Sequence, residues 1–429
     1  MTEIRYDAAI IGAGAAGMAS ASTLSDRGYH PVLIDREEFT GGILLQCIHN
    51  GFGLHRYNEE LTGPEFAFRL EEQIEKAGIP FLSRTTVLSI EKQESEFRLL
   101  VSSAEDGLRT IICPAVVLAM GSRERNRGNI RIPGDRPAGI YTAGLAQRLI
   151  NIDGYLPGKK AVIIGSGDIG LIMARRLTLS GAEVAAVVEI QPYPSGLTRN
   201  VVQCLQDYNI PLYLSHATTR INGRERVTSV EVAPLENGTV NQEKTFSIPC
   251  DTVLLSVGLI PENELSAKTG VELNPVTNGP IVRANLMTSV PGIFAAGNVL
   301  HIHDLVDRVA EEAERAGCAC ADWLDSGGTA VPSGIQLKPG LNIRYTVPSQ
   351  IIPEQNMRIS FRSMVIIDRA VVRLEQNGRE LFSKKISWVR PGEMIQLDIP
   401  PGTIPSNKMS SGNSPVTVSL YNAESEDKK

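Results

Sequence analysis

The sequence has few cysteines, and none of them forms a recognisable pair. Six cysteines are spread over 429 residues without a Cys-x-x-Cys motif. This pattern is typical of reduced thiols in a cytoplasmic protein, and it argues against a disulfide framework or a cluster site. Cys318-x-Cys320 is too tightly spaced and too isolated for a zinc or iron–sulfur site, so we expect it on a packed helix. We therefore expect a cytoplasmic protein.

The sequence also lacks long apolar runs and an excess of positive charge. No run approaches the ~18 apolar residues that would suggest a membrane span, and the chain enters a strand pattern too early for a signal peptide. The net charge of −6 argues against nucleic acid as a partner. With 42% apolar and 21% charged residues the composition is that of an ordinary globular protein. At 429 residues the chain is too long for one core, so two or three domains are expected.

The most informative pattern lies between residues 5 and 35. An apolar run leads into a glycine-rich turn, a helix of small residues and a second apolar run that ends on Asp35. Gly12 permits a tight turn, Gly14 lets the backbone reach a pyrophosphate, and Gly17 lets the helix pack close to the sheet. The helix N-terminus offers N–H groups to phosphates, and the acid accepts ribose hydroxyls. The stretch predicts a dinucleotide site.

The same pattern recurs between residues 160 and 189. A strand pattern precedes Gly165-Ser166-Gly167-Asp168-Ile169-Gly170, and a helix and a second strand lead to Glu189. This acid lies 24 residues after the first glycine (189 − 165), against 23 in the first copy (35 − 12). A repeat of the complete unit is more specific than either copy alone. Because a carboxylate accepts ribose hydroxyls but repels a 2′-phosphate, Glu189 predicts NAD(H) over NADP(H).

These patterns predict an α/β protein with two Rossmann-like domains, the second inserted in the first, and a C-terminal antiparallel β domain. The expected bounds are 1–122 and 251–328 for the first domain, 123–250 for the second, 336–423 for the β domain and 424–429 for a disordered tail. A helix is expected from about Asp304 to Leu324, with Asp304 capping its first turn and Asp307 completing a variant capping box.

Two such units, followed by Gly297-Asn298, resemble the two-dinucleotide-binding-domain flavoproteins linked to FAD and NAD, the group that contains thioredoxin and glutathione reductases. The resemblance covers about residues 5 to 325. It implies that the first unit binds FAD and the second NAD(H), and that Met120-Gly121 and Val257-Gly258 are crossings between the domains. Asn298 stands where the family has an Asp at the flavin ribityl chain. The candidate cofactor-binding residues are Gly12, Gly14, Ala15, Ala16, Gly17, Asp35, Arg36, Gly42, Gly121, Gly165, Gly167, Asp168, Ile169, Gly170, Glu189, Gly258, Gly297, Asn298, Asp304, Leu305 and Val306.

The sequence departs from the disulfide reductases of this family in its cysteines. Those enzymes need paired cysteines beside the flavin, whereas Cys47 stands alone after the double glycine, and Tyr141-Thr142-Ala143-Gly144 replaces the Cys-x-x-Cys of thioredoxin reductases. We therefore do not expect disulfide reduction by that mechanism. The strings GGILLQCIHNGFGLH and AAGNVLHIHDLVD are similar to a narrower group, the FAD-dependent oxidoreductases that accompany glycerol-3-phosphate dehydrogenase-like subunits in bacteria. This resemblance implies electron transfer between FAD and NAD(H) in a homo- or hetero-oligomer with a partner dehydrogenase.

The candidate catalytic residues are Cys47, His49 and His303. One interpretation places Cys47 at the isoalloxazine ring as a redox thiol, and the other, which we favour, makes it a packed cysteine. His49 or His55 is a candidate proton donor to a substrate or to oxygen. His301-x-His303-Asp304 lacks further ligands, so we expect these histidines to line the flavin pocket or to satisfy backbone groups, without a metal.

The helix N-terminus from Asp304 to Val306 is expected to face the pyrimidine end of the flavin, with the carboxylate of Asp304 turned to the backbone. Two rival functions remain open at this point. One is a stand-alone NADH oxidase or peroxidase that uses Cys47 as a sulfenic acid, and the other is a non-catalytic scaffold whose nucleotide sites stabilise an assembly. For the β domain we favour a docking surface for another subunit over a structural cap.

Overall fold

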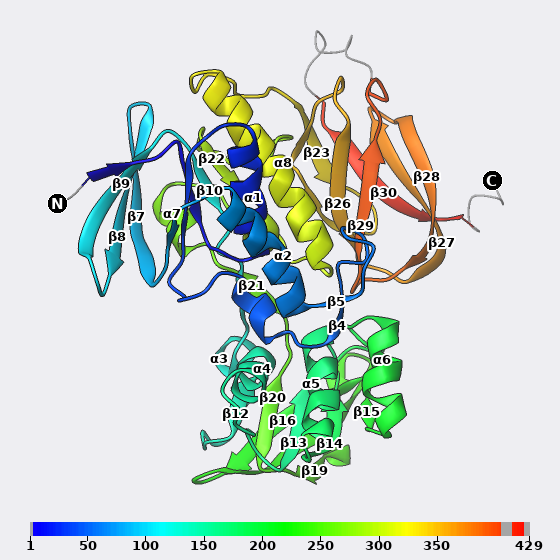
Figure 1. Ribbon diagram of the computed structural model, residues 1–429. Coiled ribbons are helices and arrows are strands. Elements are labelled where there is room, and N and C mark those ends of the chain that lie inside the picture. The colour runs from blue at the N-terminus through cyan, green and yellow to red at the C-terminus, as the bar shows by residue number, and fades with distance from the viewer. Residues whose placement is uncertain (1–2, 405–413, 424–429) are drawn as a thin grey trace. The chain divides into compact units, whose positions relative to one another are not determined.

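The computed structural model describes residues 3–404 and 414–423 of the chain (Figure 1). It consists of two compact units. Unit 1 comprises Met1–Leu45, Asn50–Ser122 and Pro261–Lys429, and unit 2 comprises Gln46–His49 and Arg123–Ile260. The tail expected at 424–429 lies outside the described residues. Both units combine several sheets with helices, which confirms the α/β class.

A parallel five-stranded sheet forms the centre of unit 1. Its strands are ordered β22 (Ile293–Ala295), β10 (Val116–Leu118), β2 (Ala8–Ile11), β3 (Pro31–Ile34) and β6 (Phe81–Leu82). All four neighbouring pairs are parallel. The residues of β2, β3 and β10 are completely buried, which explains their uninterrupted apolar sequences.

Two helices of small residues pack on each other beside this sheet. They are α1 (Ala15–Asp26) and α8 (Val306–Asp325), which lie side by side in Figure 1. Ser20 Oγ donates to the carbonyl oxygen of Ala313 at 3.0 Å. A Cβ atom on Gly317 would lie only 2.9 Å from the carbonyl oxygen of Ser20, so glycine permits this close approach.

The remaining elements of this part of unit 1 flank the sheet. An antiparallel sheet contains β7 (Thr85–Gln93), β8 (Glu96–Ser103) and β9 (Gly107–Cys113), with β1 (Glu3–Arg5) parallel to β9. Helix α2 (Gly63–Lys76) begins with a capping box between Thr62 and Glu65. The shorter elements are β4 (Asn50–Phe52), β5 (Leu61–Thr62) and α7 (Glu264–Lys268).

Unit 2 is built on a second parallel sheet. Its order is β12 (Ile140–Thr142), β20 (Thr252–Leu255), β13 (Lys160–Ile164), β14 (Glu183–Val188) and β15 (Leu212–Tyr213). An antiparallel group contains β16 (His216–Gly223), β17 (Val227–Glu236), β18 (Thr239–Val240) and β19 (Phe246–Pro249). The helices are α3 (Arg127–Ile130), α4 (Ala143–Asn151), α5 (Asp168–Leu179) and α6 (Thr198–Cys204).

The boundary expected after residue 250 does not match the structure. Strand β20 pairs with β13 and β12 inside the sheet of unit 2, and unit 2 continues to Ile260. All four residues of β20 are buried, because the strand lies between two neighbours in the sheet. Two short strands, β11 (Ser122–Glu124) and β21 (Leu259–Pro261), lie where the chain passes between the units.

The C-terminal part of unit 1 consists of two sheets around their own apolar core. One has the order β25 (Gln350–Ile351), β23 (Ile335–Pro339), β30 (Val416–Asn422), β27 (Ile367–Gln376) and β28 (Arg379–Val389), and the other contains β24 (Ile343–Val347), β26 (Met357–Ser363) and β29 (Met394–Ile399). The expectation of a purely antiparallel domain is wrong at one pair, since β23 runs parallel to β30. The domain's first strand, β23, lies beside its last strand, β30, and both run in the same direction.

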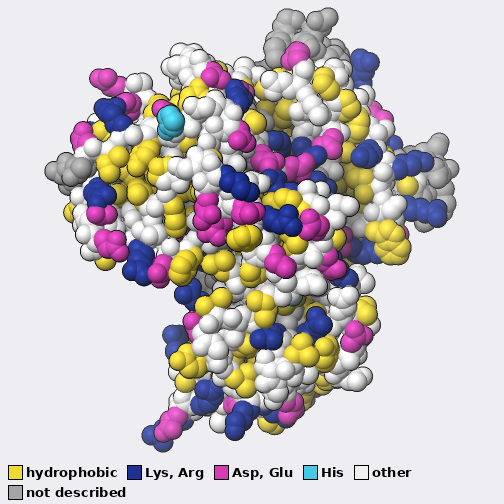
Figure 2. Space-filling view, in the orientation of Figure 1, with side chains coloured by type: hydrophobic (Ala, Val, Ile, Leu, Met, Phe, Trp, Pro, Cys, Tyr) yellow, Lys and Arg dark blue, Asp and Glu magenta, His cyan; other side chains and the backbone are white. Residues whose placement is uncertain are grey.

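The face of the molecule that Figure 2 draws is mixed in charge. Acidic and basic side chains are interspersed over this face. Among the described residues, no helix is both long and apolar enough to cross a bilayer.

Candidate functional site

The three glycines of the first turn have three different environments in unit 1. Gly12 has φ +105°, and a Cβ atom there would lie 2.3 Å from the carbonyl oxygen of Ala119. A Cβ atom on Gly17 would lie 1.7 Å from the carbonyl oxygen of Gly12. Gly14, the N-cap of α1, has no other atom within 4 Å of its Cβ position. Gly12 and Gly17 are thus required by the packing of the protein itself. Gly14 instead borders open space at a helix N-terminus.

Two further glycines meet the first turn of α1. A Cβ atom on Gly42 would lie 3.3 Å from Cα of Gly14, and one on Gly297 would lie 2.9 Å from Cβ of Ala16. Three separate segments of unit 1 therefore present bare backbone around the N-terminus of α1. This arrangement fits the pyrophosphate of a dinucleotide, which needs close backbone approach and N–H donors.

Asp35 lies at the edge of this group. Its Oδ2 accepts the N–H of Ala13 at 2.7 Å, and its Oδ1 accepts the N–H of Glu37 at 3.0 Å. The carboxylate is partly exposed and retains acceptor capacity for ribose hydroxyls. Ala15 and Ala16 are buried in the first turn of α1, and Arg36 is exposed beside Asp35. Contacts of these side chains with a cofactor remain predictions.

The second glycine turn repeats this geometry inside unit 2. Gly165 has φ +89°, and its Cβ position lies 2.1 Å from the carbonyl oxygen of Ser256, while that of Gly170 lies 2.6 Å from Cβ of Ser256. Gly167 is the N-cap of α5, and Asp168 and Ile169 begin the helix. The Cβ position of Gly167 lies 3.1 Å from Ser256 Oγ, so this cradle is narrower than the first.

Glu189 accepts four hydrogen bonds from neighbouring groups of unit 2. It is 4% exposed and accepts from Ser166 N at 2.9 Å, from Ser166 Oγ at 2.5 Å and from Ser195 Oγ at 3.0 Å. The N–H of Gln191 donates to its other oxygen at 2.9 Å. Three of these donors share Oε2 and one reaches Oε1, so Oε1 retains acceptor capacity for a ribose hydroxyl. The expected contact with ribose hydroxyls stays a prediction.

A segment that the sequence analysis did not identify lies against the second glycine turn. Ser195 N donates to Ser166 Oγ at 2.8 Å, and Gly196 N donates to the carbonyl oxygen of Ser166 at 2.9 Å. Asp168 accepts from Leu197 N at 2.8 Å and from Asn200 Nδ2 at 2.6 Å. Pro192 and Pro194, which break secondary structure before Ser195-Gly196, were the available signal for such a loop.

The prediction that Asp304 caps the helix is wrong. Helix α8 begins at Val306 with Leu305 as its N-cap and without a side-chain cap. The carboxylate of Asp304 instead forms an ion pair with Arg362 of β26 and accepts the N–H of Met394 at 2.6 Å. The tertiary partners take the carboxylate because they supply a charge as well as a donor. Whether Leu305 and Val306 face a flavin stays a prediction.

The variant capping box with Asp307 is also absent. Asp307 is buried and accepts backbone N–H groups of a distant loop, from Gly53 at 3.1 Å, His55 at 3.1 Å and Arg56 at 2.9 Å. Three N–H donors on one carboxylate fix this loop against the start of α8. The contact of His55 with Asp307 is therefore made by its backbone N–H.

Cys47 belongs to the short segment of unit 2 that packs against α4. Its Sγ lies 3.8 Å from Oε1 of Gln147, and Gln46 Nε2 donates to the carbonyl oxygen of Gly144 at 2.9 Å. Burial raises the pKa of the Cys47 thiol to about 12, so the thiol is neutral at physiological pH. This environment favours the packing interpretation. His49 is partly buried in the same segment, and its role as a proton donor stays a prediction.

Unit 2 has no thiols where thioredoxin reductases carry their Cys-x-x-Cys. At this position Thr142 caps α4 by accepting from Leu145 N, and the N–H of Gly144 donates to Glu124 at 2.8 Å. All six cysteines lie among the described residues, and no two of them form a disulfide. The unit boundaries after Ser122 and Ile260 follow Gly121, which has φ +70°, and Gly258, which has φ +98°.

Alkylation should distinguish the six thiols. Cys318 is exposed on α8, whereas burial raises the pKa of Cys47 and Cys113 to about 12 and of Cys204 and Cys250 to about 11, and raises that of Cys320 further. Because only the thiolate reacts, iodoacetamide at pH 8 is expected to modify Cys318 alone in the folded protein. Peptide mapping by mass spectrometry checks this, with urea-unfolded protein as the control. Modification of Cys47 as fast as Cys318 would contradict it.

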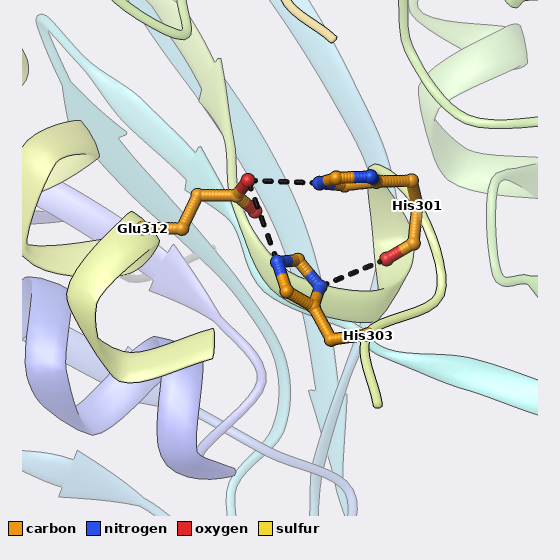
Figure 3. A group of neighbouring side chains, drawn as sticks. All are labelled: His301, His303 and Glu312. Carbon is orange, nitrogen blue, oxygen red and sulfur yellow. Dashed lines mark hydrogen bonds and ion pairs between the residues drawn. The ribbon is translucent and has the colours of Figure 1, made fainter. Parts of the chain in front are cut away.

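His301, His303 and Glu312 form a buried polar cluster in unit 1 (Figure 3). His301 Nε2 lies 2.9 Å and His303 Nε2 lies 3.5 Å from Oε2 of Glu312. The other carboxylate oxygen accepts the N–H of Gly297 at 2.8 Å. His303 donates its backbone N–H to Asn298 Oδ1 at 3.0 Å, and its ring Nδ1 donates to the carbonyl oxygen of His301 at 3.1 Å. The two histidines therefore lie at the Gly297–Asn298 turn.

Comparison with known proteins gives one family and several relatives. A sequence profile described as pyridine nucleotide-disulphide oxidoreductase matches residues 6–319. An opine oxidase subunit of Agrobacterium tumefaciens (strain Ach5) is 30% identical over 320 residues, which cover 68% of this chain and 61% of that protein. An alkyl hydroperoxide reductase subunit of Pseudomonas aeruginosa is 29% identical over 298 residues, which cover 68% of this chain and 53% of that protein. The chain thus spans less than two thirds of either relative.

The fold also matches solved structures. The thioredoxin reductase of T. acidophilum superposes with a TM-score of 0.62 at 23% identity, over 75% of this chain and 99% of that chain. At this identity the match shows a shared fold.

Proposed function

Because the chain belongs to the pyridine nucleotide-disulphide oxidoreductase family, we propose that it passes hydride equivalents between FAD bound in unit 1 and NAD(H) bound in unit 2. Proteins of this family bind FAD and NAD(P)H, and the chain is accordingly an FAD-dependent oxidoreductase. The assignment of each nucleotide to one unit, with the NAD unit inserted in the FAD unit, is part of the proposal.

The observation that carries the proposal is the open face of Gly14 at the N-cap of α1. Bound FAD would supply the hydride acceptor and donor. The chain's own residues would bind and orient it: the first turn of α1 and Gly42 face the pyrophosphate, Asp35 faces a ribose, and the Gly297–Asn298 turn faces the ribityl chain. In unit 2 the Gly165–Gly170 turn would hold the second nucleotide.

A preference for NAD(H) over NADP(H) is supported by the charge of Glu189. The carboxylate lies at the end of β14 beside the second glycine turn, where it would repel a 2′-phosphate. Ser195 and Ser166 hold it in place.

We further propose that the electrons leave by way of a partner protein, without a thiol relay. Cys47 is a partly buried, neutral thiol packed on α4, which supports this route. The two relatives named above are themselves called subunits, which also supports a partner. A glycerol-3-phosphate dehydrogenase-like partner is the narrower form of the proposal. It rests only on the similarity of the strings GGILLQCIHNGFGLH and AAGNVLHIHDLVD to the proteins that accompany such dehydrogenases. The scattered cysteines, none of them in a disulfide, support a cytoplasmic location.

Anaerobic titration of the purified protein with NADH tests the hydride transfer. We expect one equivalent of NADH to bleach the flavin absorbance band, and NADPH to do so at least about tenfold more slowly because of the repulsion at Glu189. Protein that contains FAD but is not reduced by NADH would favour the scaffold function instead.

The Cys47→Ser variant separates the proposal from a peroxidase. Serine cannot form a sulfenic acid, so a thiol-dependent NADH oxidase or peroxidase would lose its activity. We expect flavin reduction by NADH to stay within about twofold of wild type, since the substitution at a packed site is nearly isosteric. Cys318→Ser serves as the matched control. A large loss in Cys47→Ser alone would restore the peroxidase as the better assignment.

A further inference from the structure

We propose that Glu312, which is hydrogen-bonded to His301 and lies close to His303, is a positioning residue that sets the Gly297–Asn298 turn for binding FAD. The inference rests on the proposed function of unit 1 as the FAD unit. It concerns three buried polar side chains that lie outside the glycine turns, and it assigns them a role in the affinity for the cofactor.

The first contact in the argument joins Glu312 to the backbone of the turn. Its Oε1 accepts the N–H of Gly297, which has φ +76° and packs against Ala16 at the start of α1. A left-handed glycine has several alternative backbone states, so a charge-assisted hydrogen bond to its N–H selects one of them. Glu312 thereby fixes the turn at the place where α1 begins.

The second contact determines which group of Asn298 is available to a ligand. The side-chain Oδ1 accepts the N–H of His303, so the amide orientation follows from the donor, and Nδ2 is the group left to donate. Asn298 is partly exposed, unlike Gly297 on one side and Val299 on the other. The side chain therefore offers an N–H donor to a hydroxyl or phosphate oxygen.

The third contact explains why a carboxylate is tolerated at this depth. Glu312 is 1% exposed, yet it accepts from both Gly297 N and His301 Nε2, and Arg315 lies 4.0 Å from Oε2. Burial lowers the pKa of His301, and the ring donates its Nε2 proton to the carboxylate. Burial opposes ionisation of Glu312, but its histidine neighbours outweigh this effect and keep its pKa well below the usual value.

The same three side chains could in principle hold a metal ion, since their ligand atoms lie within 4.8 Å of one another. Two features argue for hydrogen bonding instead. The atoms of Glu312 and His301 that would coordinate the ion already bond to each other, and the guanidinium of Arg315 lies beside the same oxygen. A divalent cation would have to break the hydrogen bond between His301 and Glu312, and it would lie close to the positive charge of Arg315.

The Glu312→Gln variant tests the proposal through FAD binding to the apoprotein, measured by quenching of flavin fluorescence. Glutamine has no charge and cannot accept from both donors with the same strength, so we expect the dissociation constant to rise about tenfold to a hundredfold. Glu311→Gln, at the neighbouring position of α8 where the side chain is 38% exposed, is the control and should bind FAD as wild type does.

A double-mutant cycle separates positioning from a general loss of structure. If Glu312 acts through the turn, Asn298→Ala removes most of the effect, and the double variant binds FAD no more weakly than the weaker single variant. Effects that multiply, or wild-type affinity in Glu312→Gln, would overturn the proposal. Stoichiometric metal in the purified protein that is lost in Glu312→Gln would overturn it as well.

A second pair of variants covers the case in which Glu312→Gln does not fold. His301→Gln keeps an N–H donor toward Glu312 and should retain FAD, whereas His301→Leu removes it and should weaken binding. Equal affinities of the two would overturn the proposal. A wild-type protein that binds no FAD would instead refute the proposed function, so the two failures are distinguishable.

Discussion

Gly14→Ala is expected to abolish tight FAD binding in a protein that folds normally, whereas Gly17→Ala is expected to destabilise the fold. Both variants add one methyl group to the same turn. At Gly14 the methyl meets no protein atom and the backbone, with φ −77°, suits alanine, so only a ligand is obstructed. At Gly17 it would lie 1.7 Å from the carbonyl oxygen of Gly12.

The two effects are measured separately. We expect the FAD dissociation constant of Gly14→Ala to rise at least about tenfold, equivalent to about 1.4 kcal/mol, with an unchanged melting temperature of the apoprotein. Gly17→Ala should lose about 1–3 kcal/mol or more of unfolding free energy, because the backbone of the turn must shift. Each variant is the control for the other. A Gly14→Ala variant with wild-type FAD affinity would place the pyrophosphate elsewhere.

Arg362→Met is expected to cause a large loss of stability in the C-terminal part of unit 1. The side chain is 14% exposed, donates to the carbonyl oxygen of Ile302 at 3.0 Å and pairs with Asp304. Methionine retains the apolar volume but leaves Asp304 as a partly buried charge without its cation. Removing one partner of a buried pair costs about 3–5 kcal/mol, so we expect a loss near the lower bound in urea unfolding.

Arg390→Met is the matched control. Arg390 lies in the same β domain and pairs with Asp368, whose side chain is 71% exposed. Exposed pairs contribute roughly 0–1 kcal/mol, so this variant should unfold almost as wild type does. Addition of Asp304→Asn to Arg362→Met should recover part of the loss, because it removes the unpaired charge. Equal losses in Arg362→Met and Arg390→Met would contradict the importance of burial.

The capping prediction at α8 shows where reasoning along the sequence reaches its limit. Asp304 and Asp307 have the residue type and spacing of helix caps, and cap signals are local. In the structure Asp304 pairs with Arg362 of β26 and Asp307 accepts N–H groups from residues 53–56. Partners so far away in the chain cannot be read from a four-residue pattern.

Glu312 was missed for a related reason. It lies in the middle of a helix among charged residues, Glu311 and Glu314, where a glutamate is ordinarily solvated. Its burial depends on how α8 packs against α1 and on the turn at Gly297. The expectation that His301 and His303 line the flavin pocket or satisfy backbone groups agrees with the contact of His303 Nδ1 to the carbonyl oxygen of His301, but the carboxylate of Glu312 beside both rings was not anticipated.

The glycine turns were predictable because their requirements are local and act on the backbone. The strand–turn–helix geometry itself requires a positive φ at Gly12 and Gly165 and leaves no space for a Cβ atom at Gly17 and Gly170. The sequence contains two copies of this geometry. Buried parallel strands are likewise encoded by their continuous apolar runs. Side-chain partners such as Glu189 with Ser195, the place of β20 in unit 2 and the parallel pairing of β23 with β30 were decided only by tertiary structure. These depend on which distant groups meet, because a polar side chain removed from water pairs with whatever donor or acceptor the folded chain brings to it.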